Sequence, residues 1–349
     1  NNPAYQALWN KIKEVSIKDI KQVYKDINTS FDLYEGESDC YPYIPKMIKY
    51  MEDNNYLRES QEAKVIDIKE ETDKSPMPPL VVIKSNGATL YATRELATLY
   101  SRIERFNPDE IWYFADFRQS LYFEQVFRAA KKSKLIPENT KLGFYGFGTM
   151  NGPDGKPFKT RDGNVMSLKE LIHLLENETL TRLNKDIVSK DKQKETSKQI
   201  AIAALKYADL IPYRETDYIF DPSKFVSLDG KTGPYLLYST IRMKSLLNKA
   251  EEKNYYITKL KNKTDRQVAI TLLKLPQVLT RCLEQKSLNE LTDYIYKLTS
   301  SYNTFYNECK VLVEPDKAQK LSWLALTKLV YNTNIQILNI LGIDVPEKM

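Results

Sequence analysis

The feature that most constrains the fold is a change of hydrophobic pattern at Leu80, where short apolar stretches begin to alternate with amphipathic ones. The pattern predicts strands over 80–84, 111–114 and 141–145, and helices over 94–106 and 121–132. A strand-helix-strand-helix-strand order is the layout of half a doubly wound parallel sheet. Functional groups of such sheets gather at the carboxyl ends of the strands, so we expect a site there.

The rest of the chain indicates helices. Apolar residues recur at helical spacing in the first 70 residues, 65–68 is a possible strand, and 70–79, with three prolines, is a loop. From Ala201 onward the pattern is mostly amphipathic helix. The predicted fold class is α/β plus all-α: part of a doubly wound parallel sheet followed by a helical bundle over about 215–349.

Charge and cysteine content narrow the class of protein. A net charge of +6 suits a polyanionic partner without requiring one. Cys40, Cys282 and Cys309 are far apart and form no CxxC pair, which excludes a cysteine-rich zinc site and a disulfide framework. No apolar run is long enough to span a bilayer, so we expect a soluble, cytoplasmic protein.

A basic loop precedes the predicted helix 167–177. Between Gly155 and Gly163 it carries Lys156, Lys159 and Arg161. Such cations can fold over a polyphosphate, and the glycines let the backbone approach it closely. The alternative is a solvated surface turn, which is what a basic Gly/Pro loop usually is.

Several blocks together resemble one family. They are 85–97 (SNGATLYATRELA), 115–123 (ADFRQSLYF), the basic loop, Phe31-Asp32 with 36–38, 230–235 (GKTGPY), 303–309 and the ending 341–349. In this order and spacing they look like the arginine–tRNA ligases, the class I aminoacyl-tRNA synthetases for arginine. The basic loop is similar to that family's divergent KMSKS loop, and the resemblance covers essentially the whole chain.

The resemblance implies an activity and a domain plan. The complete enzyme would activate arginine with ATP, with Mg²⁺ sharing the phosphate charge, and transfer it to its tRNA. Residues 1–79 would be a helical connective region, 80–190 the C-terminal half of the nucleotide-binding catalytic domain, 191–214 a helical connection and 215–349 the anticodon-binding domain. We expect a monomer.

The resemblance also implies an arginine pocket. The matching positions are Tyr91, Glu95 and Gln119, where Glu95 replaces the family's aspartate. A buried anion with well-placed acceptors would meet the guanidinium fork and reject lysine and citrulline. The alternative for Glu95 is a surface ion pair with Arg94 or Arg102.

Other positions are expected near ATP. Asp116, Tyr122 and Phe144 would neighbour the ATP site, and the last two stand where many family members carry histidine. The cations Lys156, Lys159 and Arg161 are the expected catalytic residues, facing the ATP phosphates and stabilising charge on the pyrophosphate leaving group. The sequence contains no dedicated carboxylate cage for a metal ion.

Tyrosines and cations are interleaved in the predicted bundle. Stacking on aromatic rings with cations along the phosphates is typical of RNA-loop recognition, and the expected contacts are Tyr235, Arg242, Lys244 and Tyr306. The alternative is that these tyrosines pack, since Tyr294, Leu298 and Tyr302 at spacings of four equally predict a core stripe.

One family motif has no counterpart. The chain holds a single histidine and no HIGH signature, and it opens at Asn1 without methionine. We therefore expect an N-terminally truncated portion that is inactive alone. The alternative from another class is a non-catalytic tRNA-binding paralogue.

Overall fold

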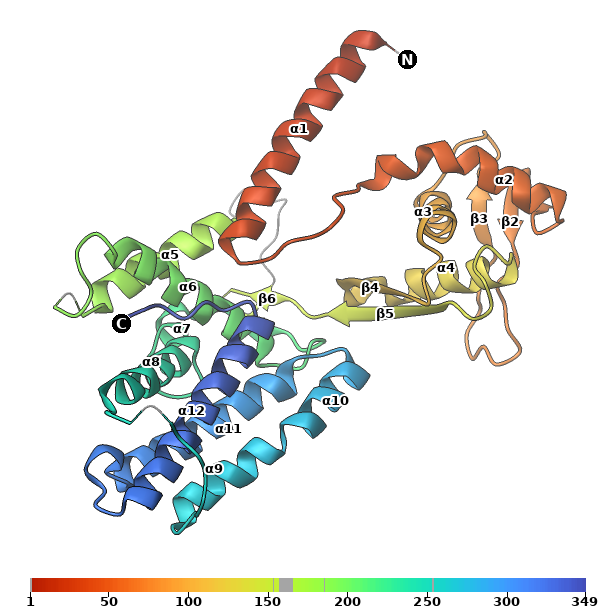
Figure 1. The fold of residues 1–349 in the computed structure, drawn as a ribbon. Helices are drawn as coiled ribbons and strands as arrows, with labels where there is room; N and C mark the ends of the chain where they lie inside the picture. The colour runs from red at the N-terminus through yellow and green to blue at the C-terminus, as the bar shows by residue number, and fades with distance from the viewer. Residues whose placement is uncertain (1, 153, 157–165, 185, 253) are drawn as a thin grey trace. The chain divides into compact units, whose positions relative to one another are not determined.

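The computed structural model describes residues 2–152, 154–156, 166–184, 186–252 and 254–349. Its contacts divide the chain into two units. The sheet unit is Phe31–Gly148, and the helical unit combines Asn1–Ser30 with Thr149–Met349. Figure 1 labels the elements of both units.

The sheet unit holds five strands and three α-helices among the described residues. Its elements are η1 (Glu37–Tyr43), α2 (Ile44–Asp53), β1 (Arg58–Ser60), β2 (Ala63–Ile66), β3 (Leu80–Ile83), α3 (Tyr91–Phe106), β4 (Glu110–Asp116), η2 (Phe117–Gln119), α4 (Ser120–Lys132) and β5 (Lys141–Phe147). One hydrophobic core joins them, with Val82, Leu96 and Val126 fully buried in it.

Strands β4 and β5 form the predicted parallel pair. They run in register from Glu110 opposite Lys141 to Asp116 opposite Phe147. The side chains of β4 alternate: Ile111 and Tyr113 are buried, whereas Trp112 and Phe114 are exposed. One face of the pair therefore packs in the core, and the buried face includes Tyr113.

Strand β3 differs from the prediction. We expected it to be a parallel strand of the same sheet as β4, but it pairs antiparallel with β2, with Val65 opposite Val81 and Ile66 opposite Leu80. The physical reason is the loop 67–79, which turns the chain back and returns it beside β2. The first strand of the strand-helix alternation thus belongs to a separate three-stranded sheet with β1 and β2.

The start of α3 is fixed by one threonine. The Thr93 hydroxyl accepts a hydrogen bond from Leu90 N (2.9 Å) and donates one to the Val82 carbonyl of β3. Helix α3 consequently begins at Tyr91, three residues before the predicted start, directly after the turn that follows β3. This start places Tyr91 and Glu95 on successive turns of one helix.

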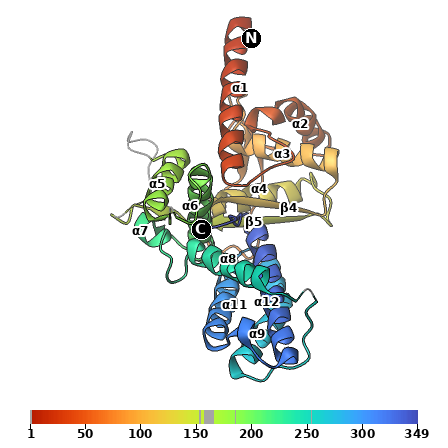
Figure 2. The same ribbon diagram turned by 60° about the vertical axis from the view of Figure 1, so that its left-hand side comes forward.

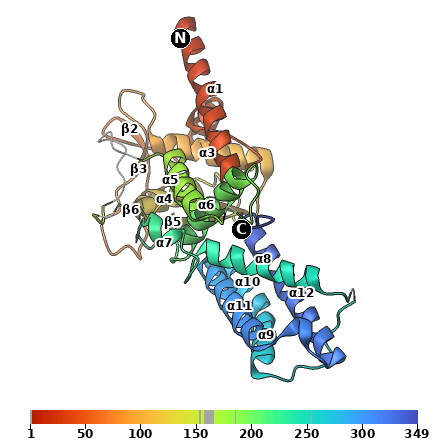
Figure 3. The same ribbon diagram turned by 90° about the vertical axis from the view of Figure 1, so that its left-hand side faces the viewer.

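The helical unit contains two short parallel strands and most of the helices. Its elements are α1 (Pro3–Asp26), β6 (Met150–Asn151), α5 (Leu168–Arg182), α6 (Gln193–Leu210), β7 (Tyr218–Ile219), α7 (Pro222–Phe225), α8 (Gly233–Lys249), α9 (Lys263–Leu273), α10 (Leu275–Gln285), α11 (Asn289–Glu308), η4 (Val311–Val313) and α12 (Lys317–Ile340). Helices α8, α9, α11 and α12 lie side by side as the predicted bundle (Figures 2 and 3).

The bundle core contains the predicted stripe of α11. Tyr294, Leu298 and Tyr302 are all buried, so these two tyrosines are packing residues. The Tyr302 hydroxyl bonds to Thr327 Oγ1 (3.3 Å) and the Tyr294 hydroxyl donates to the Leu272 carbonyl (3.4 Å), which satisfies both polar tips inside the bundle.

The C-terminal end of helix α1 and the residues after it are tied to the rest of the helical unit. Lys198 Nζ pairs with Asp26 (2.7 Å), and Asn28 Nδ2 donates to Asp344 (2.7 Å). No residue of α1 is buried. Figures 1 to 3 agree that its N-terminal part extends away from the other helices of this unit.

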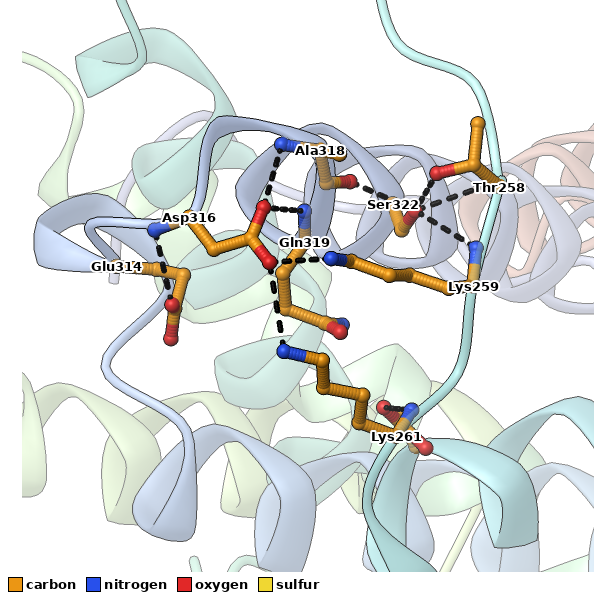
Figure 4. Close-up of polar contacts among 9 residues, drawn as sticks. Thr258, Lys259, Lys261, Glu314, Asp316, Ala318, Gln319 and Ser322 are labelled. Atoms are coloured by element: carbon orange, nitrogen blue, oxygen red, sulfur yellow. Dashed lines mark hydrogen bonds and ion pairs between the residues drawn. The ribbon is translucent and has the colours of Figure 1, made fainter.

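The segment before α9 is tied to the start of α12 (Figure 4). Asp316 caps α12 by accepting from Ala318 N (3.0 Å) and Gln319 N (3.2 Å), and both Lys259 and Lys261 pair with its carboxylate. These charges hold the pKa of Asp316 far below its usual range, with the Lys259 bond as the largest cause.

Two classes of feature are not found in the described part of the chain. No helix there combines the length and apolar character that crossing a bilayer requires. The same residues contain no group of three or more histidine, cysteine, aspartate or glutamate side chains that could hold a metal ion. All three cysteines are free thiols, as expected from their spacing, and all three are buried.

Candidate functional site

A cavity of about 570 Å³ opens in the sheet unit. It is lined by η1 and the segment before it, by one side of α3 along its length, by the middle of β4, by the end of η2 and by the start of α4. Its lining includes Glu35, Glu37, Asp39, Cys40, Tyr91, Arg94, Glu95, Arg102, Tyr113, Gln119, Tyr122 and Phe123.

Glu95 is the acidic group of this cavity whose environment is least compensated. It is half-buried, and burial raises the pKa of its carboxyl above the usual value, while Tyr113 and Arg102 act in the opposite direction. Within the described chain no cation comes within ion-pair distance of Glu95. A half-buried carboxylate without a salt bridge is a ready partner for a cationic ligand.

The neighbouring arginines are engaged elsewhere. Arg94 Nη1 pairs with Glu37, and Arg105 Nη2 pairs with Glu35 (2.6 Å). The Arg102 guanidinium instead stacks over the Tyr113 ring, 5.1 Å from its centroid. The alternative from the sequence, a surface ion pair of Glu95 with Arg94 or Arg102, is therefore wrong: Arg94 pairs with Glu37 of η1, and Arg102 lies over the Tyr113 ring.

The other two predicted arginine-binding residues line the same cavity. Tyr91 is 71% exposed at the first position of α3, with the Arg94 guanidinium 5.1 Å from its ring centroid. Gln119 is exposed and comes from η2, directly before α4. The structure thus brings Tyr91, Glu95 and Gln119 together from two elements that are far apart in the sequence.

The three residues predicted to neighbour ATP lie in different environments. Tyr122 lines the cavity, and burial raises the pKa of its hydroxyl. Asp116 lies outside the lining: its carboxylate accepts from Arg118 N (2.9 Å) and Nε (2.8 Å), which lowers its pKa to about 2 and caps the turn into α4. Phe144 stacks on Phe123 in the core, with ring centroids 5.1 Å apart.

The basic loop is described only at its first cation. Lys156 is exposed, and its backbone N donates to Asp154 Oδ1 (3.1 Å) in a turn. Lys159 and Arg161 lie outside the described residues. Helix α5 begins directly after the loop with a capping box, in which Ser167 Oγ accepts from Glu170 N (3.2 Å).

Two of the four predicted RNA contacts meet in a second cavity, in the helical unit. It has about 490 Å³ and lies between α8, the end of α11 and η4. The Arg242 guanidinium lies over the Tyr306 ring, 4.5 Å from its centroid, and Nη2 donates to Asn303 Oδ1. Two further cations line the same cavity: Lys310, which belongs to the interleaved tyrosines and cations of the sequence, and Lys249, which sequence reasoning missed.

The other two predicted RNA contacts lie differently. Tyr235 is packed against the bundle core, and its hydroxyl accepts from Asn303 Nδ2 (2.8 Å). Lys244 does not line the second cavity, because it lies two residues from Arg242 and so on another side of α8; its charge acts on Glu347. The heptad spacing between Arg242 and Lys249 was the signal that could have identified the right face.

Two family models and a set of curated relatives match this chain. Residues 1–222 match the family model described as tRNA synthetases class I (R), catalytic domain, and residues 236–349 match the DALR anticodon binding domain. Arginine–tRNA ligases of Alkaliphilus oremlandii and Agathobacter rectalis are each 40% identical over 99% of this chain. The chain spans about 60% of the length of these curated relatives.

Solved structures show the same fold. Arginyl-tRNA synthetase from Plasmodium falciparum superposes with a TM-score of 0.84 at 25% identity, covering 100% of this chain and 60% of that one. The Thermus thermophilus enzyme gives a TM-score of 0.81 at 20% identity, over 100% of this chain and 68% of that one, which supports the fold alone. Because the catalytic-domain model covers more than half of its residues, the chain belongs to the arginine family of class I tRNA synthetases.

Proposed function

We propose that this chain is the arginine-binding and tRNA-binding portion of an arginine–tRNA ligase. The observation that carries the proposal is the cavity of the sheet unit, which brings Tyr91, Glu95 and Gln119 together around a carboxylate that has no ion pair within the described chain. The relatives named arginine–tRNA ligase support it.

In this proposal the guanidinium of arginine is the partner of Glu95. A guanidinium presents a planar fork of donors that matches a carboxylate in a bidentate geometry. Citrulline has the same shape but no charge, and lysine lacks the fork, so both would leave the half-buried carboxylate poorly compensated. Tyr91 and Gln119 would contact the ligand at the mouth of the cavity.

ATP is the second substrate in the proposed reaction, as in class I synthetases generally. The arginine carboxylate would attack the α-phosphate and release pyrophosphate, so the step needs no general base. Lys156, Lys159 and Arg161 would stabilise the charge that develops on the pyrophosphate. The described residues offer no ligand cluster for Mg²⁺, and we derive no step through that ion.

The domain plan goes with the same proposal. Residues 1–79 would be connective, 80–190 catalytic, 191–214 a connection and 215–349 anticodon-binding, in a monomeric cytoplasmic enzyme. We expect the chain to bind both arginine and tRNA. The competing function, a non-catalytic tRNA-binding paralogue, is favoured by the glutamate at position 95, and it predicts tRNA binding without arginine binding.

Calorimetric titration with arginine, citrulline and lysine tests the proposal. We expect saturable arginine binding, much weaker binding of the other two, and loss of arginine binding in Glu95→Gln. Glu104→Gln is the matched control, because Glu104 is also on α3 but is exposed and pairs with Lys46 (3.4 Å) outside the cavity. Arginine binding that is absent, or equal in wild type and Glu95→Gln, would contradict the proposal.

A further inference from the structure

Tyr113 is the residue of the sheet unit whose polar group is least explained by the fold. It lies in the middle of β4, is 9% exposed, and packs against Phe123 and Phe127 with ring centroids 4.9 and 5.4 Å away. These contacts and the Arg102 guanidinium above the ring fix the phenol in place. The ring is therefore held rigidly, as a precise positioning group would require.

The Tyr113 hydroxyl is buried, and the described part of the protein gives it no hydrogen bond of good geometry, although Glu95 lies close enough to act on its pKa as a hydrogen-bond partner. An unmet buried donor costs about 1–3 kcal/mol, so such a group in a native structure calls for an explanation. Phenylalanine would fill the same volume without this cost. Because Tyr113 lines the cavity, the explanation that fits is a partner within the cavity.

Glu95 is the acceptor available to the Tyr113 hydroxyl. Both residues line the same cavity, and the Glu95 charge acts directly on the Tyr113 hydroxyl. Glu37 is taken by Arg94. The groups that act electrostatically on Glu95 are Tyr113, Arg102 and Glu37, and Glu95 in turn acts on Tyr122 and the Cys40 thiol.

We propose that Tyr113 is a positioning residue for substrate recognition: its hydroxyl donates to the Glu95 carboxylate and orients it for a guanidinium. The inference rests on the proposed function. A carboxylate has about four lone-pair positions, of which a bidentate guanidinium uses two, so Tyr113 and the ligand do not compete. Burial raises the pKa of the Tyr113 hydroxyl far above its usual range, so the group keeps the proton that it donates, and Arg102 stacks on the ring rather than occupying the carboxylate.

The test removes the hydroxyl and keeps the ring. Tyr113→Phe should raise the arginine Kd about tenfold or more, as expected for losing a hydrogen bond to a charged group. The carboxyl of Glu95, followed by ¹³C NMR in labelled protein, should titrate at higher pH in the variant than in wild type. Tyr100→Phe, a half-buried tyrosine of the same core outside the cavity, should change neither value.

The two readouts separate the inference from the proposed function. If wild type binds no arginine, the proposed function fails and the Glu95 titration still decides the role of Tyr113. If arginine binds equally to wild type and Tyr113→Phe, and Glu95 titrates alike in both, the inference is wrong. If Tyr113→Phe does not fold, the ¹³Cζ chemical shift of Tyr113 replaces it as the readout. This shift should differ from wild type in Glu95→Gln and stay constant in Glu104→Gln. An unchanged shift in Glu95→Gln would overturn the inference.

Discussion

Gly233→Ala is the substitution whose effect on the helical unit follows most directly from the structure. Gly233 is buried at the first position of α8, after Thr232, whose hydroxyl accepts from Tyr235 N (3.2 Å) and caps the helix. A Cβ at Gly233 would overlap the carbonyl of Ala203 in α6 and lie 2.9 Å from Ala204 N. The absence of a side chain is therefore what lets α6 and α8 pack at this distance.

The cost can be worked from that overlap. Carbon atoms need about 3.5–4.0 Å, so one helix backbone must move by roughly 1 Å. Overpacking a core costs about 1–3 kcal/mol, and a rigid helix backbone places this site at about 3 kcal/mol. At about 2–4 °C per kcal/mol for a unit of this size, the melting temperature should fall by roughly 6–12 °C.

Differential scanning calorimetry measures this loss, and Gly230→Ala is the control. Gly230 has a φ of +82° and no atom within 4 Å of its built Cβ, so only backbone strain of about 1 kcal/mol is expected there. The reasoning is refuted if Gly233→Ala changes the stability by less than about 0.5 kcal/mol, or by no more than Gly230→Ala does. A displaced α8 should also weaken tRNA binding, because α8 carries Arg242.

Three further substitutions have defined outcomes in urea unfolding. Glu95→Gln should stabilise the chain at pH 7, because burial raises the folded-state pKa of the Glu95 carboxyl. The gain in stability should vanish as the pH falls below about 4, the ordinary pKa of a glutamate. A gain that is independent of pH would contradict this reasoning. Leu298→Ala, fully buried in α11, should cost about 2–5 kcal/mol, and a cost below about 1 kcal/mol would mean that the stripe is not core. Asp316→Asn should destabilise the chain at neutral pH, because the lowered pKa contributes stability that is present above about pH 4 and is lost in strong acid; equal stability at pH 7 would contradict it.

Local pattern predicted the elements well and their pairing less well. The short apolar run Ile111–Phe114 between two amphipathic stretches identified β4, whereas the alternation of buried and exposed side chains along it appears only in the structure. The partner of β3 was not predictable in the same way: Leu80–Ile83 reads as a buried strand whichever neighbour it has. Pairing depends on where the loop 67–79 returns the chain, which no local period encodes.

The sequence predicted which residues line the cavity, but not which of their charges pair with one another. The family blocks predicted Tyr91, Glu95 and Gln119, which line one cavity, and Arg94, the alternative surface partner of Glu95, pairs with Glu37 instead. Adjacent residues on a helix point about 100° apart, so Arg94 reaches a different element. The burial of a carboxylate depends on all the elements that pack around it, and the local sequence pattern of one element does not say which others these are.

The central claim is that this chain binds the tRNA for arginine selectively. The most direct test is a titration with arginine tRNA at low and moderate salt, with a tRNA of another specificity as competitor. The claim predicts selective binding that persists at moderate salt, since base contacts add to phosphate attraction. Replacing Lys249 and Lys310 with alanine should lower the salt dependence, because both cations line the cavity with Arg242 and Tyr306. Equal binding of both tRNAs that vanishes with salt would contradict the claim and leave only non-specific phosphate attraction.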